Sequence, residues 1–172
     1  MNFFLARIVL ALASCMLGFG CSSARVFQTS GSMGSVGTVS DVHVSIHPGS
    51  LDVDTESYYR TNSISGLLRT AVLAELRRKG KVDTNGAKIE ISVTDFRLRS
   101  GSAVFWVGVM AGSDHIASVI VVKKGNISLK TFEASASGNE SLWSALATGR
   151  LSTGSRANLF CQMIARDIAS QL

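Results

Sequence analysis

The chain has 172 residues, with one apolar run at the N-terminus and a remainder long enough for a single compact domain with its own core. Lysine and arginine exceed aspartate and glutamate by 17 to 12, but the cations are scattered along the chain. A nucleic-acid-binding domain would cluster its cations among aromatic side chains, so the composition argues against that class. No second apolar run approaches the roughly 20 residues that span a membrane.

Residues 1–20 have the pattern of a secretory signal peptide. Arg7 is their one charge, and the apolar run from Ile8 to Gly20 is too short to cross about 30 Å of hydrocarbon. The run leads into Leu17-Gly18-Phe19-Gly20-Cys21, which resembles the lipobox of bacterial lipoproteins. In that class the signal is cut before the cysteine, which then receives fatty acyl groups such as palmitate. The resemblance therefore implies lipid attachment at Cys21.

Two alternatives to this lipid site stay open. Leu12-Ala13-Ser14-Cys15 also fits a lipobox and would place the lipid on Cys15, although it leaves a very short apolar region after Arg7. An ordinary cleaved signal without lipid is the other alternative. If Cys15 carries the lipid, a disulfide between Cys21 and Cys161 becomes possible. If Cys21 carries it, Cys161 is the one thiol left, and its apolar helical surroundings predict that it is buried.

The lipid predicts where the protein resides. Several acyl chains together hold a protein firmly on a bilayer. Ser22, rather than an aspartate, follows Cys21, and by analogy with enterobacterial sorting this implies transfer to the outer membrane. We therefore expect a lipid-anchored protein at the periplasmic face of a bacterial outer membrane.

The mature chain begins with a segment that predicts no regular structure. Residues 21–40 are rich in serine and glycine, which is typical of a flexible tether, and residues 41–172 are expected to form one domain. In that domain Val42, Val44 and Ile46 alternate with polar residues, which predicts a half-buried strand.

A helix is predicted next. Apolar residues recur at helical spacing from Ile64 to Leu76, Thr61 or Ser63 can cap the start, and Gly80 can adopt the left-handed conformation that ends a helix. The basic run at 77–81 falls at the end of this helix, where cations interact favourably with the helix dipole. Contact of this run with acidic lipid headgroups is the alternative.

Three further strands and a second helix follow. Alternation from Ala87 to Val93 predicts one strand, and residues 116–122 and 127–134 predict two more, joined by a hairpin at Gly125-Asn126. Residues 137–154 are expected to form a loop. Apolar residues at helical spacing from Ala157 to Ile168 predict a final helix, capped by Ser155.

This order predicts an α/β fold. A helix between the first two strands favours a parallel crossover, and the hairpin adds antiparallel strands. The expected fold is a two-layer sandwich in which two helices cover one mixed four-stranded sheet, in the order β-α-β-β-β-α.

The chain also resembles a known family. The residues that carry the resemblance are the helix at 64–80, KIEISVTDFRLRSG at 88–101, SVIVVKKGNISLKTFEAS at 118–135 and the final helix, all behind a lipobox. Together they resemble the bacterial lipoproteins of the domain of unknown function 4410 family. That family is similar in fold to the curli-secretion lipoprotein and to the N-terminal domain of the Tol translocation protein. The resemblance implies an envelope protein that supports assembly, with no catalytic residues to transfer.

No catalytic or metal-binding group stands out among the polar residues. His43 and His47 lie four apart on a predicted strand, which separates them by about 13 Å. Asp52, Asp54 and Glu56 provide too few oxygen ligands for a calcium loop. We expect no enzyme activity, no cofactor and no metal.

A hydrolase is the weakest alternative considered. Ser113 and His115 place a hydroxyl near an imidazole in the sequence. However, the members of a catalytic triad usually come from distant segments, so closeness in sequence is a poor sign of one.

The apolar segment at 103–112 is the favoured contact site. Its candidate contact residues are Val104, Phe105, Trp106, Val107, Val109 and Met110. If exposed, such a patch marks an interface with a partner, a sister subunit or the bilayer; the alternative is a buried strand extension. The favoured function is a lipid-anchored, non-catalytic interaction domain that binds other envelope proteins or itself. A subunit of an oligomeric outer-membrane secretion channel is the second hypothesis.

Overall fold

The structure is a computed structural model that describes residues 22–31, 36–47, 63–99, 113–138 and 152–172. Five strands and two helices lie in these ranges. In chain order they are β1 (Ser22–Gly31), β2 (Val39–Ile46), α3 (Ile64–Arg78), β3 (Ala87–Arg97), β4 (Asp114–Lys124), β5 (Ile127–Gly138) and α6 (Thr153–Gln171).

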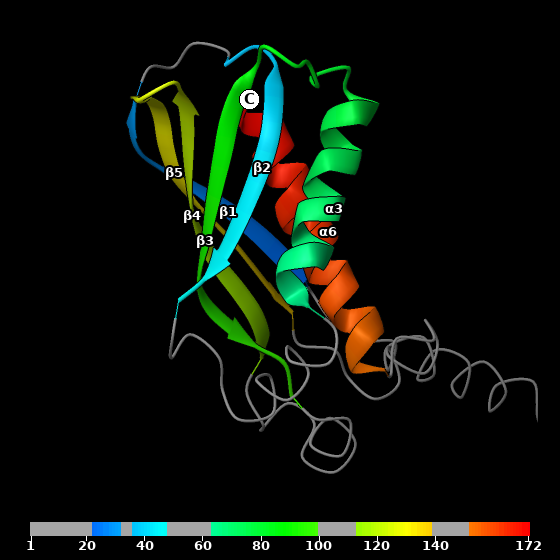
Figure 1. Ribbon diagram of the computed structural model, residues 1–172. Helices are drawn as coiled ribbons and strands as arrows, with labels where there is room; N and C mark the ends of the chain where they lie inside the picture. Colours follow the sequence, from blue (N-terminus) through cyan, green and yellow to red (C-terminus); the bar gives the residue numbers. More distant parts are fainter. Residues whose placement is uncertain (1–21, 32–35, 48–62, 100–112, 139–151) are drawn as a thin grey trace, which may run out of the picture.

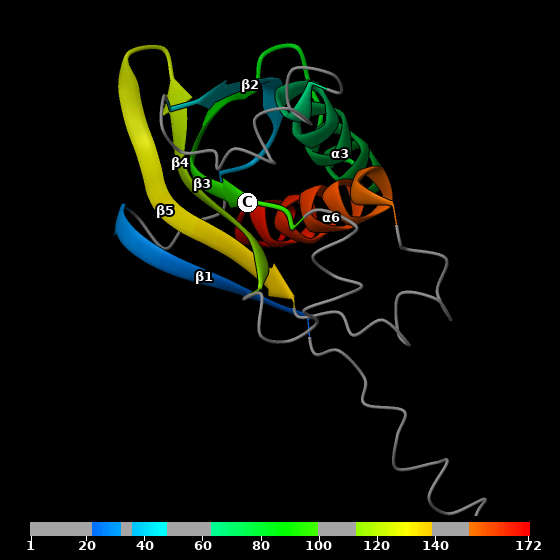
Figure 2. The same ribbon diagram turned by 90° about the horizontal axis from the view of Figure 1, so that it is seen from below.

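All five strands form one open sheet in the order β1-β5-β4-β3-β2. Only β2 and β3 run parallel, and α3 connects them, while the other neighbours are antiparallel. Both helices cover the same face of the sheet, which curves around them (Figures 1 and 2). The predicted two-layer α/β sandwich with a mixed sheet and a parallel crossover is confirmed.

The sheet has one strand more than the sequence predicts. β1 pairs along its length with β5, from Ser22 opposite Gly138 to Gly31 opposite Lys130. The predicted tether therefore does not hold for residues 22–31, and the four-strand prediction is corrected to five. The reason is that an edge strand is held by main-chain hydrogen bonds, which need no alternation of apolar side chains.

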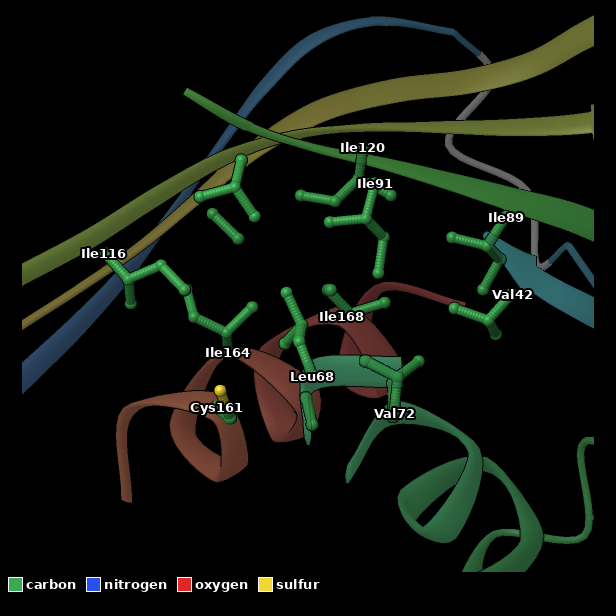
Figure 3. Packing of buried hydrophobic residues seen from close by; sticks show 14 of the residues in the cluster. Val42, Leu68, Val72, Ile89, Ile91, Ile116, Ile120, Cys161, Ile164 and Ile168 are labelled. Carbon is green, nitrogen blue, oxygen red and sulfur yellow. The ribbon is translucent and has the colours of Figure 1, made fainter. Parts of the chain in front are cut away.

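The core lies between the sheet and the helices. Alternate residues of β3 and β4, among them Ile89, Ile91 and Ile120, point from the sheet toward the helices, and all three are fully buried. Figure 3 shows Leu68 of α3 and Ile164 of α6 meeting them from the other layer. The period of two in the strands and of about four in the helices thus gives one continuous apolar layer.

α3 ends as predicted, but its N-terminus is not capped as predicted. Gly80 has a φ of 66°, its N–H bonds to Arg77, and the N–H of Lys81 bonds to Leu76, which is the expected glycine closure. Ser63 occupies the N-cap position but has a left-handed φ of 49°, and its side chain makes no capping hydrogen bond.

α6 begins earlier than predicted. Ser152, not Ser155, is the N-cap, and its Oγ accepts a hydrogen bond from the Ser155 N–H at 3.1 Å. The C-terminal carbonyls of α6 accept from lysines outside the helix. Lys79 Nζ donates to the Ala169 carbonyl and Lys130 Nζ to the Gln171 carbonyl, each at 2.8 Å. Cations at a helix C-terminus are favoured by the helix dipole.

Candidate functional site

One end of the sheet gathers the features that the sequence marks for contact. Ser22 of β1 lies opposite Gly138 of β5, which in turn lies opposite Asp114 at the start of β4. Arg97 at the end of β3 pairs with His115 beside them. We call this the anchor end, because the predicted lipid site, Cys21, directly precedes Ser22 in the chain.

The predicted contact segment is attached at the same end. The residues that flank it are Arg99, which follows β3, and Ser113, which precedes β4. Val104, Phe105, Trp106, Val107, Val109 and Met110 themselves lie outside the described residues, as do Cys15 and Cys21. The strand register alone therefore brings the two flanks of this segment to the same end of the sheet as Ser22, the first residue after the predicted lipid site.

A buried ionic cluster joins these flanks to α6. The Asp114 carboxylate accepts hydrogen bonds from the Arg99 backbone N–H at 2.8 Å and from Arg99 Nε at 3.1 Å. Its other oxygen accepts from Arg156 Nη1 at 2.5 Å, while Arg156 Nη2 donates to the Arg99 carbonyl at 2.5 Å. The three side chains are at most 3% exposed, and together they bind both main-chain groups of Arg99.

The cluster costs free energy that an apolar core would not. Removing three charged groups from water is expensive, and their mutual attraction repays this only when the hydrogen bonding is good. Arg156 also stands in the first turn of α6, where the helix dipole disfavours a cation, so Asp114 offsets an unfavourable placement. Such a cluster is better explained by what it holds in place than by net stability.

Sequence reasoning missed this cluster, although one signal was available. Arg156 precedes Phe160, Ile164 and Ile168 by multiples of four, so it lies on the buried stripe of the helix. A charged residue on such a stripe must find a buried counter-charge. The pattern could not identify Asp114 as that partner, because the pairing depends on how α6 crosses the sheet.

The residues of the hydrolase alternative are not arranged as a nucleophile and a base. Asp114 is committed to the arginines, and the His115 ring contacts Ser113 through the backbone carbonyl of that serine, at 3.3 Å. His115 Nε2 lies 2.8 Å from Asp95 Oδ2 in a largely exposed pair. Among the described residues, these contacts leave the Ser113 hydroxyl without a base.

The remaining predicted ligand residues are dispersed. His43 and His47 are exposed on and just after β2, while Asp52, Asp54 and Glu56 lie outside the described residues. Within the part of the chain that the structure describes, no three metal-ligating side chains come together. No helix in that part is long and apolar enough to span a bilayer.

Cys161 is fully buried on the sheet-facing side of α6, as predicted, and it is a free thiol (Figure 3). Burial raises its pKa to about 12. A thiol that stays protonated at neutral pH is a poor nucleophile.

A shallow groove runs between the exposed sides of α3 and α6. Its volume is about 630 Å³, and its walls include Leu67, Ala71, Glu75, Asn158 and Gln162. Leu67 and Ala71 belong to the predicted apolar stripe of α3 but are only half-buried. The groove contains no cluster of titratable side chains, since Glu75 is its one charged residue and is paired with Arg78.

The fold and the site define a two-layer α/β domain in which β1 forms one edge of the sheet. The solved PelC dodecamer from Paraburkholderia phytofirmans has the same fold, with a TM-score of 0.51 and 14% identity over 84% of this chain and 96% of that chain. A variant of that dodecamer in another crystal form gives a TM-score of 0.49 at 13% identity and equal coverage.

These findings correct the predicted family while keeping the predicted kind of fold. No family model matches the chain, and no curated protein matches it. The resemblance to the domain of unknown function 4410 family is therefore not supported. The fold itself is shared with the PelC structure.

Proposed function

We propose that this protein is a non-enzymatic lipoprotein of the bacterial envelope, held in the outer membrane by acyl groups on Cys21, that works as one subunit of a larger assembly. The observation that carries the proposal is the register at the anchor end. Ser22, Gly138 and Asp114 lie side by side, so a lipid one residue before Ser22 would bring this end of the domain to the bilayer.

The same register gives the 103–112 segment a role. Its flanks lie at the anchor end, and its six apolar candidates would be costly to leave in water. At that end they can bury their surface either at the periplasmic leaflet of the outer membrane or against a neighbouring subunit. The cluster of Arg99, Asp114 and Arg156 would then fix the direction in which the segment leaves the sheet.

Self-association is supported by the shared fold. PelC forms a dodecamer, and a head-to-tail contact repeated around a closed axis forms a ring. This supports the secretion-channel hypothesis over an interaction domain that acts alone. The geometry of Ser113 and His115 gives no support to the hydrolase alternative.

Two measurements on the membrane-extracted chain test the proposal. Mass analysis of its N-terminal peptide should find acyl groups on Cys21, and Cys21→Ser should release the chain from the membrane while Cys15→Ser should not. The mass of the detergent-solubilised particle should correspond to many copies, and Trp106→Asp should reduce it or detach it from lipid. An unacylated monomer whose behaviour Trp106→Asp does not change would contradict the proposal.

A further inference from the structure

The two edges of the sheet differ in how they are protected. In the sheet that the described residues form, β1 and β2 are the edge strands, and each pairs with one neighbouring strand. Edge strands offer main-chain N–H and C=O groups to other chains, and proteins commonly block them with charged side chains or proline. β1, with the sequence SSARVFQTSG, contains one charged residue and no proline. It therefore has little of its own to prevent another strand from pairing with it.

The pairing of β2 with β3 shows which main-chain groups of β2 face its open side. In a parallel pair, residues whose N–H and C=O face the partner alternate with residues whose groups face away. The N–H of His47, just after β2, donates to the Val93 carbonyl of β3 at 3.1 Å. Val42, Val44 and Ile46 therefore direct their main-chain groups to the open side of the strand.

Two charged side chains bind the main-chain groups of Val42 on this open side. Arg69 belongs to α3, which lies beside β2 (Figure 1), and its Nε donates to the Val42 carbonyl at 2.8 Å. Asp41 Oδ1 accepts from the Val42 N–H at 2.8 Å and from Arg69 Nη2 at 3.0 Å. The hydrogen bond from Arg69, and after it that from Val42, lowers the pKa of Asp41. Both main-chain groups of Val42 are thus occupied by a half-exposed ion pair.

The start of β2 is covered by a main-chain contact. The Val39 N–H donates to the Lys81 carbonyl at 2.8 Å, and the Val39 carbonyl accepts from the Asp83 N–H at 3.0 Å. These groups lie on the side of Val39 that faces away from β3, because the residue before it, Thr38, accepts from the Ala87 N–H of β3. The connection that leads into β3 therefore occupies the open side of β2 at its first residue.

Val44 and Ile46 are the outward positions that remain within the described part of β2. Each residue contributes one N–H and one C=O, so a strand paired at these two positions alone would form at most about four main-chain hydrogen bonds. Release of Val42 would add the adjacent outward position and about two more hydrogen bonds. The Arg69–Asp41 pair therefore shortens the stretch of β2 that another strand could join.

We propose that the Arg69–Asp41 pair closes the β2 edge to strand addition, and that the strand it excludes is β1 of another copy of this chain. β1 is the other edge of the same sheet, so a contact between β1 and β2 is head-to-tail and leaves an edge at each end for further copies. A contact between two β1 strands stops at two copies, so closing β2 alone prevents open-ended growth. Many copies on one membrane surface would favour such growth, and this last argument alone rests on the proposed function.

The test uses the full processed chain in detergent and a fluorescein-labelled peptide with the β1 sequence, residues 22–31. Fluorescence anisotropy should show that Arg69→Gln binds this peptide at least about 10-fold more tightly than the unchanged chain, because the Val42 carbonyl becomes available. Asp41→Ala frees the Val42 N–H and should also raise the affinity, although it changes the net charge in the opposite direction. The matched control is Arg78→Gln, which removes another exposed arginine of α3 that is paired with a carboxylate. It should change the affinity less than about 2-fold.

A second substitution locates the bound peptide. Val44→Pro removes an outward N–H from β2, at a position where an edge strand tolerates proline. In the Arg69→Gln background it should return the affinity to that of the unchanged chain. A peptide that instead replaces β1 beside β5 would bind the unchanged chain and Arg69→Gln equally, and Val44→Pro would not affect it.

Three outcomes would overturn this inference: no gain in peptide affinity in Arg69→Gln and Asp41→Ala, an equal gain in Arg78→Gln, or a gain that Val44→Pro leaves intact. Both single variants should remain folded by circular dichroism, because an exposed ion pair contributes little to stability. Acylation and oligomer mass do not enter this assay, so its failure leaves the proposed function untouched and the reverse also holds.

Discussion

The two ends of the domain differ in where their charged side chains lie. At the anchor end Arg99, Asp114 and Arg156 are withdrawn from water and pair with one another. The opposite end of the sheet, which we call the distal end, is formed by the last turn of α3, the connection to β3 and the hairpin between β4 and β5. There the charged side chains stay largely in water, as in the ion pair between Lys123 and Glu90. Buried charges must be paired and hold one geometry, whereas exposed charges cost little and can meet a ligand. The two ends therefore differ in whether their charged side chains are buried and paired or left in water.

The largest effect is expected at the anchor end. Asp114→Ala leaves two arginines buried without their carboxylate, so it should lower the free energy of unfolding by about 3–5 kcal/mol. The control is Asp95→Ala, which removes a half-exposed carboxylate paired with His115 and should cost at most about 1 kcal/mol. Urea denaturation measures both. Equal costs for the two variants would remove the contrast between buried and exposed charge.

At the distal end the main chain at Gly86 packs directly against the main chain at the start of β2, and the missing side chain of glycine allows this. A Cβ at Gly86 would lie 2.6 Å from backbone atoms of Thr38 and Val39, so Gly86→Ala must displace the start of β2 and should cost about 1–3 kcal/mol. Gly66→Ala is the matched control. It meets only the end of the Ser63 side chain, at 3.3 Å, and should stabilise the exposed helix by about 0.5–1 kcal/mol. Thermal unfolding should therefore move in opposite directions for the two alanines.

A smaller effect is expected where α6 begins, near the buried cluster. Ser152→Ala removes the hydrogen bond to the Ser155 N–H and should cost about 1 kcal/mol. Ser155→Ala keeps the capping oxygen and loses only the hydroxyl contact between the two serines, so it should cost less. If Ser155→Ala were the more harmful change, the helix would begin where the sequence alone predicts.

The smallest effect concerns Asp167 on α6. Burial raises the pKa of this carboxyl, so the folded state holds the proton more tightly than the unfolded state. At neutral pH the ionised carboxylate therefore lowers the free energy of unfolding. This penalty disappears as the pH falls through the range just above the usual aspartate pKa. Asp167→Asn should raise the unfolding midpoint at pH 7 by roughly 1–3 °C and flatten this part of the pH dependence. A lower midpoint at pH 7 would show that the charge has a partner.

The sequence predicted the elements that carry a periodic signal and missed those that do not. The stripe from Ile64 to Leu76 and the alternation in β3 identified their elements, and Gly80 ends α3 as expected. β1 was read as a tether because serine and glycine carry no alternation, yet main-chain pairing with β5 needs none. Residue type alone predicts the lipid site and the contact segment, whereas the nearness of the residues next to them depends on strand register.

The most direct test of the account is the depth of each end in a membrane. The acylated chain would be reconstituted in vesicles that contain spin-labelled lipid, with an environment-sensitive fluorophore on a single introduced cysteine, since buried Cys161 should not react. Ser113→Cys labels the anchor end and Lys124→Cys the distal end. The account predicts strong quenching at position 113 and little at position 124. Equal quenching at both positions, or stronger quenching at 124, would contradict it.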